Sequence, residues 1–246
     1  GTDSEAGSSG RCTESAGDLL MAEIRAFRGI RPAAGKEADI AALPYDVYNR
    51  EEARRAVEGR PLSFLRIDRA ETQLPEDTDI YAPEVYQKAK ELLWGMVEDG
   101  DFVQDSASCY YLYELTMNGR SQTGIVACAS IDDYLNGVIK KHENTRREKE
   151  EDRVRHVDTC DAQTGPIFLA YRNQEVLKKL VAEVKEEQVL FDFTSEDGIR
   201  HRGWKIADTE KIRAVYEAFH QMNALYIADG HHRAASAVRV GVKRRE

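Results

Sequence analysis

The sequence has little of what a membrane, secreted or nucleic-acid-binding protein needs. No apolar run approaches the ~18 residues of a membrane span, and the sequence shows no secretory signal. None of the four cysteines forms a CxxC pair, and Cys109 and Cys128 lie in apolar runs, which is typical of reduced, mostly buried thiols. The net charge of −9 argues against a general nucleic-acid binder. We therefore expect a cytoplasmic protein that binds neither membranes nor nucleic acid.

Length and composition indicate a folded core with a tail. Hydrophobic residues make up 41% of the 246 positions and charged residues 32%, which suits one large domain or two small ones. Residues 1–20 are rich in glycine, serine and acidic side chains and show no packing pattern, so we expect a disordered or expression-derived tail. The folded part then covers residues 21–246 as a single α+β domain or a domain pair.

Hydrophobic periodicity predicts a mixture of helices and hairpins after the tail. Residues 84–98 repeat apolar side chains at helical spacing. Asn118-Gly119 joins two alternating runs and is the strongest hairpin signal in the chain. The main predicted strands are residues 63–67, 109–117, 123–130, 167–171, 189–193 and 198–206. We expect an α+β fold in which a mixed β-sheet with hairpins packs against helices.

The segment around Asp229-Gly230 predicts an apolar strand, a tight turn and the start of a helix. Glycine reaches positive φ without a Cβ penalty, and alanines after Arg233 favour helix. Free backbone N–H groups at a helix start bind anions, and the histidine and arginine side chains add donors. A solvated surface turn and half of a metal site are the alternatives. The candidate phosphate or nucleotide ligands are Gly230, His231, His232 and Arg233.

A second chemical stretch lies between a short strand, residues 138–140, and a strongly charged helix. We expect Thr145 to cap this helix together with Glu148. Lys149 and Arg153 are four apart and share a helix face, so they can point at one anion. The alternative is a solvated helix with i,i+4 ion pairs. The residues before the helix, which offer a base, a metal ligand and polar donors, are His142, Glu143, Asn144 and Thr145.

A third candidate stretch, PYDV, lies before another predicted helix. Pro44 forces an extended residue before it, and Asn49 is placed to cap the helix. Tyr45 and Asp46 then lie on a loop that leads into a helix, a common place for residues that bind substrate. The alternative is a structural turn.

Five motifs occur in a fixed order, and together they resemble one family. They are AEIRAFRGIRP, PYDV, HENT…EDR, TGPIF and YIADGHHR. This set resembles the bacterial and archaeal proteins catalogued as domain of unknown function 1015, from Met21 to the C-terminus. Two departures stand out: Ala42-Leu43 precedes Pro44 where the family has a further proline, and only thirteen residues follow Arg233. The resemblance therefore implies a chain that is truncated at its C-terminus.

A DGHHR-type turn entering a helix is also similar to the phosphate-binding turn of the ParB/sulfiredoxin-like superfamily. That group includes nucleotide-switch partition proteins and free-serine kinases. Glu143-Asn144, with arginines after it, resembles the metal- and phosphate-binding EN…R segment of the partition proteins, although here it precedes the turn. The resemblance implies a ParB/sulfiredoxin-like element around DGHHR, with Mg²⁺ and ATP or ADP as cofactors.

These patterns predict a nucleotide-binding phosphotransferase, a kinase that acts on a small hydroxylated metabolite such as free serine. The candidate catalytic residues are Glu143, Asp229 and His232, with Glu143 and Asp229 also as Mg²⁺ ligands. The candidate phosphate- or nucleotide-binding residues are Gly230, His231, His232, Arg233, Asn144, Thr145 and Arg153. The candidate substrate-binding residues are Tyr45, Asp46 and His142.

Two other functions stay open on the same residues. One is a nucleotide-binding regulatory module without metabolite chemistry, and the other is a metal-dependent hydrolase with histidine and carboxylate ligands. The expected partners are a nucleotide and a small-molecule substrate, and a homo-oligomer stays open.

Overall fold

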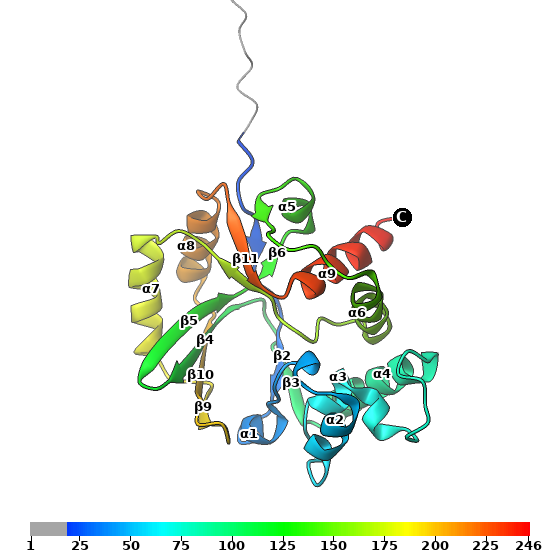
Figure 1. Cartoon of the computed structure of the whole chain (residues 1–246). Coiled ribbons are helices and arrows are strands. Elements are labelled where there is room, and N and C mark those ends of the chain that lie inside the picture. Colours follow the sequence, from blue (N-terminus) through cyan, green and yellow to red (C-terminus); the bar gives the residue numbers. More distant parts are fainter. Residues whose placement is uncertain (1–18) are drawn as a thin grey trace, which may run out of the picture.

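The structure is a computed structural model that describes residues 19–246. The tail expected at residues 1–20 lies outside the described residues except for its last two positions. Figure 1 shows a sheet region flanked by α7 (Glu175–Lys185) and α8 (Thr209–Phe219) on one side, with α6 (Arg147–Cys160), α9 (His231–Lys243) and the helices of residues 37–98 on the other. Among the helices described, none has both the length and the apolar character that a membrane crossing requires.

Helices gather in the N-terminal third of the described chain, whereas strands and helices mix after residue 102. The strands are β1 Ile24–Arg25, β2 Ile30–Pro32, β3 Phe102–Gln104, β4 Tyr110–Met117, β5 Arg120–Val126, β6 Cys128–Ala129, β7 Ile139–Lys140, β8 Phe168–Ala170, β9 Phe191–Thr194, β10 Arg200–Ile206 and β11 Leu225–Asp229. The α-helices are α1 Glu37–Ile40, α2 Arg50–Val57, α3 Leu65–Asp68, α4 Pro83–Glu98, α5 Ile131–Leu135, α6 Arg147–Cys160, α7 Glu175–Lys185, α8 Thr209–Phe219 and α9 His231–Lys243. Two 3₁₀ turns, η1 Tyr45–Val47 and η2 Ala70–Gln73, lie in the N-terminal third.

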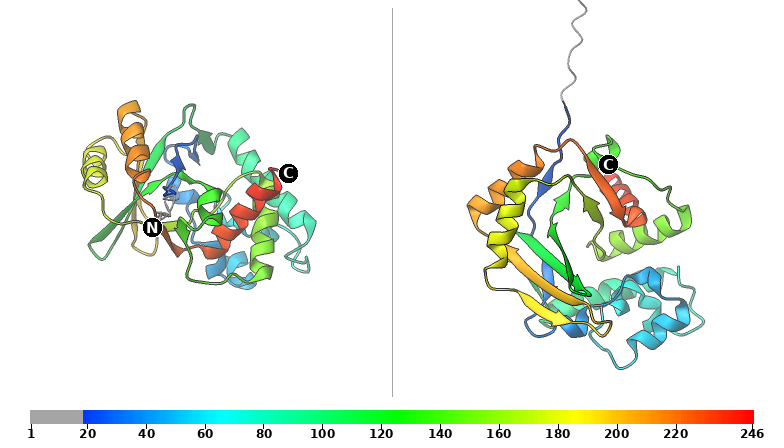
Figure 2. Two further views of the ribbon diagram at one scale, coloured as in Figure 1. Left: turned by 90° about the horizontal axis from the view of Figure 1, so that it is seen from above. Right: turned by 60° about the vertical axis from the view of Figure 1, so that its left-hand side comes forward.

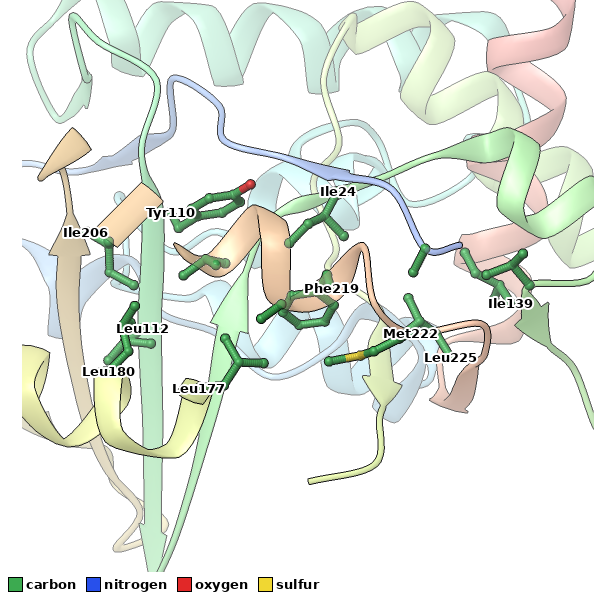
Figure 3. Packing of buried hydrophobic residues seen from close by; sticks show 14 of the residues in the cluster. Ile24, Tyr110, Leu112, Ile139, Leu177, Leu180, Ile206, Phe219, Met222 and Leu225 are labelled. Atoms are coloured by element: carbon green, nitrogen blue, oxygen red, sulfur yellow. The ribbon is translucent and has the colours of Figure 1, made fainter. Parts of the chain in front are cut away.

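The largest sheet is antiparallel and has the strand order β5-β4-β10-β9. Asn118 and Gly119 both have positive φ, which is what the tight β4–β5 turn needs. Alternate residues of β4 and β10 point toward α7 and α8, whose apolar stripes cover that face. Figure 3 shows this packing around Leu112, Ile206 and Phe219. The main core therefore lies between this sheet and two helices.

A smaller sheet, with the order β7-β11-β8, continues this core and carries two of the candidate motifs. β7 and β11 are parallel, with Ile139 opposite Leu225 and Lys140 opposite Tyr226. Carboxyl ends of parallel neighbours meet at one sheet edge. The HENT segment follows β7 and the GHHR segment follows β11, so the topology brings them to the same edge.

A second hydrophobic cluster lies among α1, α3, α4, β3 and the C-terminal end of α6. Val85, Ala89, Leu93 and Met96 form the buried stripe of α4, as the periodicity of that segment predicted. They pack with Ile67 of α3 and residues of β3 and α6. In the right-hand view of Figure 2 the helices α2 to α4 lie below the adjacent pair α6 and α9. The helix α6 contacts both α4 and α9, so it connects the two clusters.

The structure confirms the predicted α+β class and corrects three local details. The segment 63–67 was expected to be a strand, but α3 occupies Leu65–Asp68, because its apolar residues pack against α4 instead of pairing in a sheet. Thr145 does not cap α6: the N-cap is Arg146, and the Thr145 hydroxyl donates to Glu150 Oε2 at 2.5 Å. The last helix begins at His231, two residues earlier than Arg233.

Candidate functional site

The start of α9 has the shape of an anion-binding turn. Gly230 is its N-cap and has φ +87°, and a Cβ there would lie 3.0 Å from Ile167 Cγ2. Only glycine meets both constraints without strain. His231, His232 and Arg233 form the first helical turn, whose N–H groups have no partner within the helix. The helix start therefore presents backbone donors together with two imidazoles and a guanidinium.

The HENT segment contacts this helix start directly. His231 Nδ1 lies 3.5 Å from Glu143 Oε2, and the rings of His142 and His231 meet edge to face with centroids 4.5 Å apart. The backbone N–H of Arg146 donates to His232 Nε2 at 3.0 Å, across 86 residues of sequence. Because Nε2 accepts, this imidazole is neutral. Burial, with help from Lys149 and Arg146, lowers the pKa of His232 and favours that form.

Two predicted residues at this edge, Asp229 and Asn144, are exposed. The Asp229 carboxylate is largely exposed and pairs with Arg233 at 3.1 Å. Asn144 is exposed beside Glu143.

Three of the side chains, His142, Glu143 and His231, place one ligand atom each within 4.8 Å of the others. Among the residues described, this trio is the arrangement that can hold a metal ion, and Asp229 is outside it.

A cavity of about 450 Å³ adjoins the helix start. Arg233 belongs to both, because its side chain lines the cavity while its backbone begins α9. Close contacts hold Arg233 in place: a Cβ on Gly165 would lie 3.0 Å from its Cδ, and its guanidinium donates to the Pro166 carbonyl. The apolar part of the wall includes Ile40, Leu43, Phe64, Phe102, Phe191 and Phe193.

The polar part of the cavity contains a buried pair of charges. Arg153 donates two hydrogen bonds to Asp152, at 3.0 and 2.9 Å, and stacks over the Tyr45 ring at 3.9 Å. Asp68 Oδ1 lies 3.9 Å from Arg153, beyond hydrogen-bond distance, and has no hydrogen-bond partner among the described residues. Burial raises the pKa of Asp68 to about 6, against the opposing charge of Arg153.

A neutral histidine supports the segment that carries Asp68. Burial and the charge of Arg153 lower the pKa of His156 to about 4. Its Nε2–H donates to the Ile67 carbonyl at 2.9 Å, which leaves Nδ1 to accept from the Thr164 hydroxyl at 3.4 Å. Thr164 also lines the cavity. This link fixes α3 against α6 and the loop before β8.

The structure divides the predicted residues into two neighbouring groups. The HENT side chains and the first turn of α9 meet at the sheet edge, whereas Tyr45 and Arg153 line the cavity with Arg233. Asp46 is exposed and is not among the lining residues. Sequence reasoning missed Asp68, because the segment before it was read as a strand and a single Asp in a polar loop gives no signal.

Fold and site together define an α+β protein in which a polar helix start adjoins a largely apolar cavity with a buried Asp–Arg pair. The chain belongs to the family described as Protein of unknown function (DUF1015), whose sequence profile matches residues 24–246. This match confirms the family resemblance drawn from the five motifs. Neither the curated proteins nor the solved structures include a significant match to the chain. The similarity to the ParB/sulfiredoxin-like superfamily stays a prediction.

Proposed function

We propose that this chain is a phosphotransferase that binds a nucleotide at the start of α9 and phosphorylates a small hydroxylated metabolite. The observation that carries the proposal is the meeting of two motifs 86 residues apart, through the contact of Arg146 with His232, beside a cavity that shares Arg233. Phosphoryl transfer needs mainly positioning and positive charge, and this edge supplies both.

The phosphate oxygens of the nucleotide bind the first turn of α9. Three backbone N–H groups, the positive end of the helix dipole and the Arg233 guanidinium all favour an anion there. Neutral His232 adds an imidazole at the same place. Glu143 holds the divalent cation that accompanies the nucleotide. The expected ParB/sulfiredoxin-like element, with Mg²⁺ and ATP or ADP, agrees with this assignment.

The metabolite occupies the cavity. Its apolar wall covers the carbon skeleton, and Arg153 and Arg233 attract an anionic group. A carboxyl with a pKa of about 6 is suited to proton transfer near neutral pH, so Asp68 joins Glu143 and Asp229 as a candidate base. The base takes the proton of the acceptor hydroxyl while the acceptor oxygen bonds to phosphorus and the bond to the leaving nucleotide breaks.

A coupled assay tests the proposal. The full chain is incubated with ATP or ADP, a divalent cation and a series of hydroxylated amino acids, serine first, and the nucleotide product is measured. We expect turnover that His232→Ala reduces at least ~10-fold. His220→Ala is the matched control, because this histidine is exposed and only stacks on Tyr216. Absence of turnover with every acceptor, or full activity of His232→Ala, would contradict the proposal.

Two other outcomes identify the alternative functions. Tight nucleotide binding with no turnover on any acceptor supports a regulatory module. Hydrolysis that requires a stoichiometric transition metal supports a metal-dependent hydrolase, a candidate favoured by the trio His142, Glu143 and His231. A cytoplasmic location and a nucleotide as partner stay predictions from the sequence.

A further inference from the structure

The trio His142, Glu143 and His231 combines one fixed ligand with two adjustable ones. The side chain of His231 is only 5% exposed, and its Nδ1 faces the Glu143 carboxylate without making a hydrogen bond of ordinary length. Buried imidazole nitrogens are normally paired with a protein group, a water or a metal. His142 and Glu143 are exposed on the segment after β7, so their side chains can adjust around an ion.

The distances suit coordination better than a direct ion pair. His231 Nδ1 and Glu143 Oε2 are 3.5 Å apart, which is long for an N–H···O hydrogen bond. Two ligand atoms that each lie ~2.1 Å from a tetrahedral ion are separated by ~3.4 Å. The third ligand atom lies within 4.8 Å of both, so side-chain rotation at His142 can complete the set.

We infer that His142, Glu143 and His231 bind a divalent transition-metal ion of the Zn²⁺, Mn²⁺ or Co²⁺ class. Two imidazoles with one carboxylate match these ions, whereas Mg²⁺ prefers oxygen ligands only. The inference deepens the proposed function by naming a transition-metal ion at Glu143 in place of the Mg²⁺ that the ParB/sulfiredoxin-like resemblance implies. It rests on that function only for the ion's role, since binding is measured without nucleotide.

The surrounding charges limit how the ion is held. The start of α9 and the side chains of Arg146 and Lys149 are positive, whereas Glu150 and Asp229 are negative. A cation without an accompanying anion gains little electrostatic binding energy beside the positive end of a helix. Three protein ligands leave at least one coordination position, and a phosphate oxygen there adds the negative charge that this environment favours.

Cobalt titration tests this inference on the full, nucleotide-free chain. Co²⁺ reports its coordination by visible absorption, and Zn²⁺ competes for the same ligands. We expect one Co²⁺ per chain, displaced by Zn²⁺ but not by excess Mg²⁺. His142→Ala and Glu143→Gln should each weaken binding at least ~10-fold. Both positions are exposed, so these variants keep the fold, which circular dichroism verifies.

Matched controls are His220→Ala and Glu148→Gln, which remove an imidazole and a carboxylate at other exposed positions. Both should bind Co²⁺ as the unchanged chain does. Absence of saturable Co²⁺ binding, equal affinity in all variants, or ready displacement by Mg²⁺ would each overturn the inference. Failure of the phosphotransfer assay leaves these readouts unchanged, so the two proposals fail separately.

Discussion

Asp68→Asn separates a functional carboxyl from a structural one, because the change should stabilise the protein while it impairs turnover. Burial raises the pKa of Asp68 from 3.8 to about 6 in the folded state. The unfolded chain therefore loses this proton first, and stability falls as the pH rises from 3.8 to about 6. Above pH 6 the loss of unfolding free energy that the ionised Asp68 causes is constant and amounts to about 3 kcal/mol at most. Asparagine keeps the shape of the side chain and removes the ionisation.

The assay is urea unfolding of both proteins at pH 7 and pH 4. We expect Asp68→Asn to gain about 1–3 kcal/mol at pH 7 and much less at pH 4, where the carboxyl is neutral in the folded state and only about half ionised in the unfolded chain. Asp77→Asn, at an exposed position, is the matched control, and it should change the free energy of unfolding by the same amount at both pH values. An Asp68→Asn effect that is the same at pH 4 and pH 7 would refute the reasoning about burial.

Three further predictions concern the frame around the site. Gly230→Ala should cost about 1–3 kcal/mol in thermal unfolding, because φ is +87° there, whereas Gly95→Ala, in open space inside α4, should cost nothing. Asn49→Ala should cost about 1 kcal/mol by removing the capping box of α2, measured in urea. Burial raises the pKa of Asp105, but its hydrogen bonds, foremost the one from Arg31, outweigh burial and lower the pKa to about 2. Asp105→Asn should therefore destabilise the protein more at pH 7 than at pH 2.

Local patterns predicted much of this fold because the signals are local. The Asn118-Gly119 hairpin, the stripe of α4 and the Asn49 cap each depend on neighbouring residues, and the structure confirms all three. The prediction of a strand at residues 63–67 was wrong because a short apolar run suits a buried strand and a buried helix equally. Only its packing against α4 decides between them.

The site was predicted in its parts but not in its arrangement. The HENT and DGHHR motifs are recognisable as polar segments after strands. Their meeting depends on the parallel pairing of β7 with β11, across more than 80 residues, which no local pattern encodes. The cavity depends on the same long-range packing. Asp68 is a candidate only because α3, α6 and the loop before β8 pack together and place it in the cavity wall.

The central claim is that phosphate groups bind the first turn of α9. Adding ATP to the isotope-labelled full chain and following backbone amide chemical shifts tests it most directly. The amides of His231, His232 and Arg233 should shift most, in a saturable manner, while those at the start of α8, Thr209 and Glu210, stay in place. Saturable shifts confined to other parts of the chain, or no shifts at all, would contradict the claim.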